Sequence, residues 1–326
     1  MLSQANIKVV DSIPTLLSLL DNLTSVSNNP PMLYFNLEGV RLGRHGSISI
    51  ISLYIASLNK AYLIDIHRLG EAAFSTSNDS STSLKSILES PAVTKVIFDV
   101  RNASDALFSH YQISVDGIKD LQIMELACRQ DSQEVVTTLT EATLTECVEK
   151  DSAISTAVKA KLQRMEDCAR RLYDPNMGGQ YEVFNERPIR PEIIQHCAQG
   201  AALLRGLYYV YNTKLLPDWQ TFWRVQVEKA AEDRIKLSQS LGYDGQAKHK
   251  DCAAWNKWYI EKAIDDWNDE IISKVINGDL DDDYEMLRTM IVIGTRLVND
   301  HYDSHWDIGR DCIDWEDDMM EDWEYF

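Results

Sequence analysis

The sequence predicts an α/β fold built on a mixed sheet, and two observations carry this prediction. Three strand-like runs follow one another closely between residues 32 and 66, separated only by turn residues, as in an antiparallel meander. Beyond residue 84, short apolar runs instead alternate with helical stretches, which is typical of parallel strands connected by helices. We therefore expect three antiparallel strands followed by parallel ones, with helices on the sheet faces and a helical C-terminal part.

The N-terminal half supplies the elements of this sheet in order. A short strand at residues 7–10 precedes a helix that Pro14 opens, because proline suits the first helical turn. The meander strands are expected at residues 32–40, 48–56 and 61–66. Thr82 is the expected N-cap of a helix at residues 84–90. The remaining predicted elements are a fully apolar strand at 95–100, a helix at 102–111 and a strand-to-helix passage at 118–127.

The C-terminal half reads as helical. Helical patterns cover residues 142–172, and apolar residues recur at helical spacing over residues 192–215, up to Pro217. The stretch beyond is rich in tryptophan and becomes acidic towards residue 326. We predict one domain over residues 1–216 and a helical extension over residues 217–326 that ends in an acidic, Trp-rich tail.

Composition narrows the class of protein. No run of about 18 apolar residues exists, so we expect no membrane span, and residues 1–11 lack the pattern of a signal peptide. The six cysteines are scattered singly, which is typical of reduced thiols in an intracellular protein, cytoplasmic or nuclear. The net charge of −19 disfavours nucleic-acid binding by the molecule as a whole, so any such binding needs a local basic patch.

Asn36 and Glu38 form the first candidate for chemistry. Residues two apart on a strand point to the same sheet face, and two-metal nucleases place an Asp-x-Glu pair on such a strand. Taken alone, the pair is more typical of a solvated strand face.

Longer segments give the pair a context. The chain resembles the DEDD-type (DnaQ-like) 3′–5′ exonuclease domain family from about residue 6 to residue 211, and within it the branch of Egalitarian-like and fungal exonuclease-domain proteins. The segments that carry the resemblance are LEGVRLGRHG at 37–46, KVIFDVRNASDAL at 95–107, DLQIMELA at 120–127, the run 172–188 and HCAQG at 196–200. The resemblance implies a ribonuclease-H-like fold.

The resemblance also implies a degenerate active site. The four metal-binding carboxylates of the family fall on Asn36, Glu38, Ala103 and Gly200, of which only Glu38 is acidic. The residue that helps to position the attacking water falls on His196. We therefore expect the Mg²⁺ or Mn²⁺ pair, and with it catalysis, to be lost, and no cofactor or metal to be bound. Neither nearby acid is expected to substitute, because Asp105 lies about 200° around the helix from Ala103 and Asp99 stands beside the missing ligand.

Basic residues near this site suggest a path for single-stranded nucleic acid, with Tyr173, Tyr181 and Phe184 as stacking surfaces. The alternative is a solvated helix with salt bridges to Glu166 and Asp167. The candidate nucleic-acid-binding residues are Arg41, Arg44, His45, Lys159, Lys161 and Arg164.

Three functions follow from these observations. The first is a catalytically inactive exonuclease-like protein that acts as an RNA-associated or protein-interaction scaffold, with a protein partner and weak single-stranded RNA binding. Relatives that lack the catalytic acids act in this way in RNA transport or silencing. The second is a residual metal-dependent 3′–5′ exonuclease on single-stranded RNA or DNA. The third is a structural adaptor or homodimer without affinity for nucleic acid.

Overall fold

The computed structural model describes residues 6–25, 32–130, 141–245, 254–278 and 292. The chain divides into two compact units. The first comprises residues 1–128 and 142–245, and the second comprises residues 129–141 and 246–326.

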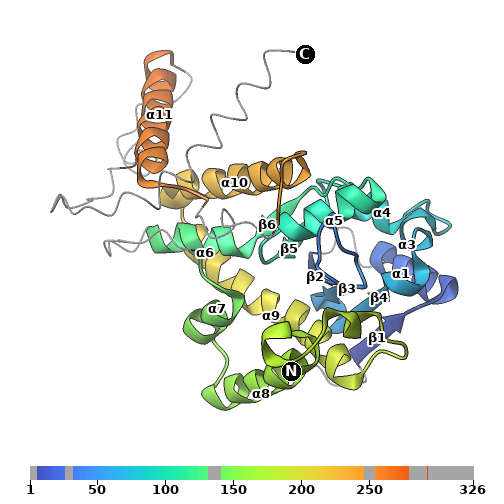
Figure 1. The fold of residues 1–326 in the computed structure, drawn as a ribbon. Helices are drawn as coiled ribbons and strands as arrows, with labels where there is room; N and C mark the ends of the chain where they lie inside the picture. Colours follow the sequence, from blue (N-terminus) through green and yellow to red (C-terminus); the bar gives the residue numbers. More distant parts are fainter. Residues whose placement is uncertain (1–5, 26–31, 131–140, 246–253, 279–291, 293–326) are drawn as a thin grey trace. The chain divides into compact units, whose positions relative to one another are not determined.

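A mixed sheet forms the centre of the first unit, with six strands among the described residues in the order β1-β4-β3-β2-β5-β6 (Figure 1). The meander β2–β3–β4 is antiparallel, whereas β1 pairs with β4, and β5 with both β2 and β6, in parallel. This confirms the predicted mixture of strand directions. The strands are β1 (Ile7–Val10), β2 (Leu33–Glu38), β3 (Ile50–Ile55), β4 (Lys60–Asp65), β5 (Lys95–Ile97) and β6 (Ile118–Asp120).

Strand alternation separates the two faces of the sheet. On β2, Leu33, Phe35 and Leu37 belong to a hydrophobic core that includes residues of α1, α4 and α5. The intervening residues face α9, since Tyr34 contacts the ring of Tyr208 on that helix. Asn36 and Glu38 therefore also point towards α9, and Figure 1 shows the strands between α5 and α9.

Most helices occupy the positions that the sequence predicts, with small shifts at their ends, whereas the short helices α2 and α3 lie where no helix is predicted. The long ones in this unit are α1 (Ile13–Ser25), α5 (Arg101–Tyr111), α6 (Leu121–Gln130), α8 (Thr156–Tyr173), α9 (Pro191–Leu215) and α10 (Thr221–Gln239). The shorter ones are α2 (Ile66–Leu69), α3 (Ala72–Ser75), α4 (Leu84–Glu89) and α7 (Leu144–Asp151), with 3-10 turns η2 (Ala56–Leu58), η3 (Pro175–Met177), η4 (Tyr181–Asn185) and η5 (Asp218–Gln220).

One predicted cap is wrong. Ser83, not Thr82, is the N-cap of α4, and its side chain accepts a hydrogen bond from the backbone N–H of Ser86. The backbone N–H of Thr82 instead donates to the side chain of Asn78. Because Thr82 belongs to this turn, the N-cap lies one residue later in the sequence than predicted.

The first unit also extends beyond the boundary expected at residue 216. Pro217 does follow the end of α9, but η5 leads directly into α10, which packs against α5 and β6. Phe222, Trp223 and Val227 of α10 are buried. The extra helix therefore completes the core of the first unit, which runs to Gly245.

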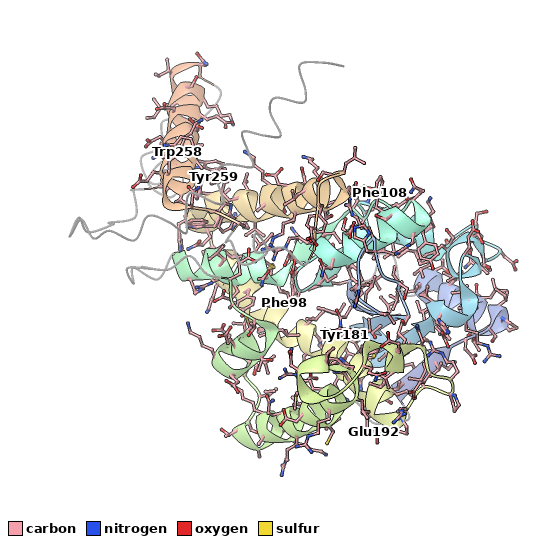
Figure 2. The ribbon with its side chains drawn as sticks, in the orientation of Figure 1. Phe98, Phe108, Tyr181, Glu192, Trp258 and Tyr259 are labelled. Carbon is pink, nitrogen blue, oxygen red and sulfur yellow. The ribbon has the colours of Figure 1, made fainter. Side chains whose placement is uncertain are left out.

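The second unit contains α11 (Lys257–Ile276), whose N-cap Asn256 accepts from the backbone N–H of Tyr259. Ile260, Ile264 and Ile271 are buried, whereas the side chain of Trp258 is 67% exposed (Figure 2). No helix in the described part of the chain is long and apolar enough to cross a membrane. The predicted acidic, Trp-rich tail lies outside the described residues.

Candidate functional site

A histidine held between two glutamates occupies the position of the predicted site. His196 of α9 lies with its Nδ1 atom 2.7 Å from Glu166 Oε2 on α8 and its Nε2 atom 3.4 Å from Glu38 Oε1 at the end of β2. The side chains of His196 and Glu38 are 12% and 19% exposed. One imidazole ring thus connects a strand of the sheet with two helices.

Aromatic rings enclose this histidine. The ring centroids of Tyr173 and Phe184 lie 5.0 Å and 6.4 Å from that of His196, and the Tyr173 hydroxyl donates to Glu166 over 2.7 Å. Phe184 is buried and Tyr173 is half-buried. Two of the three predicted stacking surfaces therefore pack around His196 and do not form an open platform. Tyr181, labelled in Figure 2, is half-buried on η4.

The two carboxylates determine the charge of the imidazole. Burial lowers the pKa of His196, but the hydrogen bonds and charges of Glu166 and Glu38 outweigh it and raise this pKa from 6.5 to about 10. For Glu166, burial raises the pKa, but the interactions of the carboxylate with His196 and Tyr173 outweigh burial and lower this pKa below 4.5. The ring is therefore an imidazolium at neutral pH, and a protonated ring is a poor proton acceptor.

The other predicted site residues lie at the same edge of the sheet. The Asn36 amide donates from Nδ2 to Glu38 Oε1 over 2.8 Å, and a Cβ atom built on Gly200 would lie 4.0 Å from that same Nδ2 atom. Ala103 lies in the first turn of α5, which follows β5, the parallel neighbour of β2. Its methyl group is buried in the hydrophobic core.

These residues do not fit a pair of divalent ions. Magnesium and manganese prefer carboxylate and carbonyl oxygens, and Ala103 and Gly200 offer no side-chain donor. Asn36 directs its amide N–H towards Glu38, and Glu38 is already bonded to Asn36 and close to His196. Glu38, Glu166 and the imidazolium together carry a net charge of only −1 against the four positive charges of two such ions.

Comparison with known proteins identifies the family of this chain. A model of the 3′–5′ exonuclease family matches residues 12–177. The chain belongs to the 3′–5′ exonuclease family. The mouse piRNA biogenesis protein EXD1 is 28% identical over 189 residues, and its human counterpart is 28% identical over 186 residues. Each match covers 56% of this chain but only 30% and 33% of the relatives, so the chain spans about a third of their length.

Solved structures show the same fold at low identity. RNase D of Trypanosoma brucei, in complex with GMP, has a TM-score of 0.60 and 14% identity, and the match covers 79% of this chain and 71% of that chain. Escherichia coli RNase D has a TM-score of 0.51 and 14% identity, with 72% and 51% covered. The exonuclease domain of this chain therefore has an RNase D-like fold.

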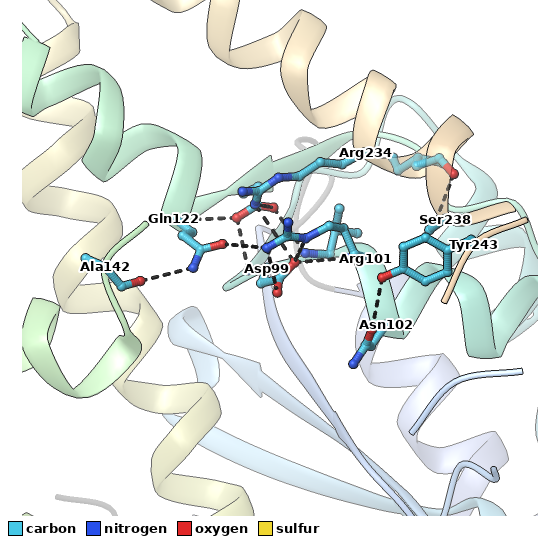
Figure 3. A network of polar contacts seen from close by, with 11 residues as sticks. Asp99, Arg101, Asn102, Gln122, Ala142, Arg234, Ser238 and Tyr243 are labelled. Atoms are coloured by element: carbon cyan, nitrogen blue, oxygen red, sulfur yellow. Dashed lines mark hydrogen bonds and ion pairs between the residues drawn. The ribbon is translucent and has the colours of Figure 1, made fainter. Parts of the chain in front are cut away.

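The two nearby acids form ion pairs with arginines. Asp105 accepts from the backbone N–H and the Nε atom of Arg44, each over 2.7 Å. Asp99 forms an ion pair with Arg101 over 2.7 Å, in a polar network that also includes Asp120, Gln122 and Arg234 (Figure 3). Both acids are thus engaged with arginines of the fold, contacts that the sequence did not indicate.

The candidate nucleic-acid-binding residues differ in what they contact. Arg44 donates to Asp105 and to the carbonyl oxygens of Ser238, Ser240 and Leu241, so its guanidinium secures the end of α10 and is no longer a candidate for phosphate contact. The ammonium of Lys159 donates to the Glu149 carbonyl over 2.6 Å. Exposed side chains are those of Arg41, His45, Lys161 and Arg164.

Glu166 is the site residue that sequence reasoning placed on a solvated helix face. It lies in α8 with Leu162, Ala169 and Tyr173 at spacings of four, three and seven residues, on the face that packs inwards. This helical periodicity is the signal that indicates an inward-facing acid. The partner itself is 30 residues away on another helix, and no local pattern identifies it.

Proposed function

We propose that this exonuclease domain is catalytically inactive and serves as an RNA-associated or protein-interaction scaffold. The observation that carries the proposal is that the one retained carboxylate, Glu38, accepts a hydrogen bond from Asn36 and lies 3.4 Å from the His196 imidazole. A carboxylate engaged in this way has no capacity to hold a metal pair by itself.

Electrostatics supports the same proposal. Two divalent ions about 4 Å apart repel each other by roughly 17 kcal/mol at an effective dielectric constant of about 20. Working sites offset this repulsion with several fixed negative charges, whereas this site adds a positive one. An imidazolium also accepts no proton, so His196 does not act as a general base at neutral pH.

The relatives support an association with RNA. Mouse and human EXD1 are named as piRNA biogenesis proteins, and a solved RNase D of Trypanosoma brucei is a complex with RNA. The fold itself is therefore compatible with RNA binding. The formal net charge of −19 requires that such binding be local and sensitive to salt.

The test is Mg²⁺-dependent trimming of a labelled single-stranded oligonucleotide by the purified chain. We expect no 3′ shortening. A Glu38→Gln variant purified in parallel is the matched control, since it removes the remaining carboxylate and reports any contaminating nuclease. Trimming by the wild type that disappears in Glu38→Gln would establish an active exonuclease and overturn the proposal.

Restoring the acids provides the complementary test. Asn36→Asp, Ala103→Asp and Gly200→Asp together are expected to regain Mn²⁺ binding and some trimming, whereas each single change does almost nothing because the ligands act as a unit. The geometry accommodates at least one of them, since a Cβ at residue 200 makes an ordinary contact with Asn36. A triple variant that binds metal and stays inert would favour a protein-interaction role over an RNA-related one.

A further inference from the structure

The outward face of α8 is a ridge of basic residues, which we call the α8 ridge and define as Lys161, Arg164 and Arg171. All three side chains are exposed. At 100° per residue they fall within about 80° of one another around the helix axis. The face spans about 15 Å along the axis, and α8 packs against α9 and η4 on its other side (Figure 1).

The cations of the ridge pair with no carboxylate of the described residues. In the described part of the chain, Lys161 and Arg171 form no hydrogen bond or ion pair, and Arg164 donates only to the carbonyl of Ala160. Asp167 lies at the border of the ridge, three residues from Arg164 and four from Arg171, but it accepts from Gln163 and pairs with neither arginine. In a chain with 51 acidic and 32 basic residues, three cations on one helix face that pair with no carboxylate among the described residues indicate a face that is open to an external anion.

Other arginines of the same region form ion pairs with carboxylates, unlike the arginines of the ridge. Arg170, one residue from the ridge but on the flank of the helix, forms an ion pair with Asp174 over 2.6 Å. Arg190 pairs with Glu186 over the same distance. The ridge therefore differs from its surroundings in pairing and not only in composition.

The ridge also faces away from the degenerate site. Glu166, which contacts His196, lies about 180° around α8 from the centre of the ridge. A ligand on the ridge therefore does not reach His196 or Glu38. This separates the surface that would hold a ligand from the position where the chemistry of the family takes place.

We propose that the α8 ridge binds the phosphate backbone of single-stranded RNA, a surface that rests on the RNA association proposed above. Two of its three cations are arginines, whose planar donors match phosphate oxygens. The small exposed residue Cys168 lies between Arg164 and Arg171, and the exposed Ala160 precedes Lys161, so that small side chains leave room for a backbone to approach. The ridge lacks a large apolar or aromatic side chain, the usual anchor of a protein interface, so phosphate recognition fits it better than a protein partner.

The experiment measures binding of a fluorescein-labelled oligouridylate to the full chain by fluorescence anisotropy between about 50 and 200 mM salt. The ridge variant carries Lys161→Glu, Arg164→Glu and Arg171→Glu. Single-stranded nucleic acids give a slope of log affinity against log salt of about −0.7 per neutralised phosphate. For three lost phosphate contacts we therefore expect the slope of the ridge variant to be smaller in magnitude by about 2. We also expect its affinity at the lowest salt to be at least tenfold weaker.

A matched control variant has the same net charge as the ridge variant. Lys60→Glu, Lys229→Glu and Lys236→Glu also replace exposed lysines, and each triple variant lowers the formal net charge by six, from −19 to −25. We expect the control to retain the wild-type slope and near-wild-type affinity. Thermal unfolding of both variants verifies that they are folded.

Each outcome has a defined meaning. If the ridge variant binds RNA like the wild type, the proposal that the ridge binds RNA is wrong, while the proposed RNA association stands. If the wild type does not bind RNA, both proposals are wrong. Equal losses of affinity in the ridge and control variants would show that binding depends on the total charge of the protein, and the ridge proposal would be wrong. Binding of labelled oligoglutamate to the ridge, with none of RNA, would assign it to an acidic peptide and also overturn the proposal.

Discussion

Two polar clusters of the exonuclease domain differ in how well their charges are balanced. Around Asp120, two aspartates meet two arginines, and the Asp120 carboxylate accepts from the backbone N–H groups of Asp99, Val100 and Gln122 and from Arg234 over 2.7 Å (Figure 3). The Asp120 side chain is fully buried. Around His196, two glutamates share one imidazolium, and the Glu166 side chain is 34% exposed.

The difference shows which polar groups the fold depends on. The Asp120 cluster fixes the start of α5 and attaches α10, and every charge in it faces an opposite one. The His196 cluster contains the predicted site residues and keeps an excess of one negative charge. The first cluster is therefore a structural element of the fold, whereas the second belongs to the candidate site.

Removal of Asp120 has the largest expected effect. Asp120→Ala leaves Arg234 and three backbone N–H groups buried without their acceptor, which should reduce the free energy of unfolding by about 3–5 kcal/mol. Guanidinium-induced unfolding followed by circular dichroism measures this change. A loss below about 1 kcal/mol, the range of an ordinary surface substitution, would show that the network contributes little.

Replacement of the histidine tests the second cluster. His196→Gln removes a charge-assisted hydrogen bond and leaves two carboxylates facing each other, so we expect a loss of about 1.5–3 kcal/mol. The value is expected to be smaller than that of Asp120→Ala because Glu166 is partly solvated. The exposed His45→Gln is the matched control and should change stability little. If the two histidine variants are equally stable, the cluster has no structural role.

The pH dependence sharpens the same test. The pKa of His196 is raised from 6.5 to about 10 in the folded protein, so its contribution to stability is complete below about pH 6.5 and is lost as the pH rises through about 10. The difference in unfolding free energy between wild type and His196→Gln should therefore shrink between pH 7 and pH 10. Unfolding curves at several pH values measure it, and a constant difference would contradict the assigned charge.

The smallest expected effect is that of a single hydroxyl group. Tyr173→Phe removes the 2.7 Å hydrogen bond to Glu166 but keeps the ring that packs on His196. We expect a loss of about 1 kcal/mol, the usual contribution of one hydrogen bond. An unchanged melting temperature would mean that solvent replaces the hydroxyl at Glu166.

Much of the fold follows from local patterns, because each pattern has a short-range cause. Alternation on β2 placed Asn36 and Glu38 on one face, and helical spacing indicated α9. The contacts of Arg44 with Ser238, Ser240 and Leu241 could not be predicted in this way, since the residues are almost 200 positions apart. The same holds for Arg234 with Asp120 and for the inclusion of α10 in the first unit.

Aromatic residues show the same limit. Trp219 and Trp223 are four residues apart, a spacing that on one continuous helix would place both on the same face. Trp223 is buried at 5% exposure, whereas Trp219 is 62% exposed because it lies in the turn η5 before α10 begins. The spacing of the two tryptophans does not show where the helix begins. It therefore does not predict whether a residue just before the helix is buried.

The separation between Asp120 and Arg234 has a consequence for the synthesis of the protein. The two residues are 114 positions apart, which at about 5–20 residues per second corresponds to roughly 6–23 s of translation. During this interval the nascent β6 carries an aspartate whose arginine has not yet been made. The sheet can therefore reach its final ion pairing only after α10 has left the ribosome, and a nascent chain that stops at residue 216 has no means to complete it.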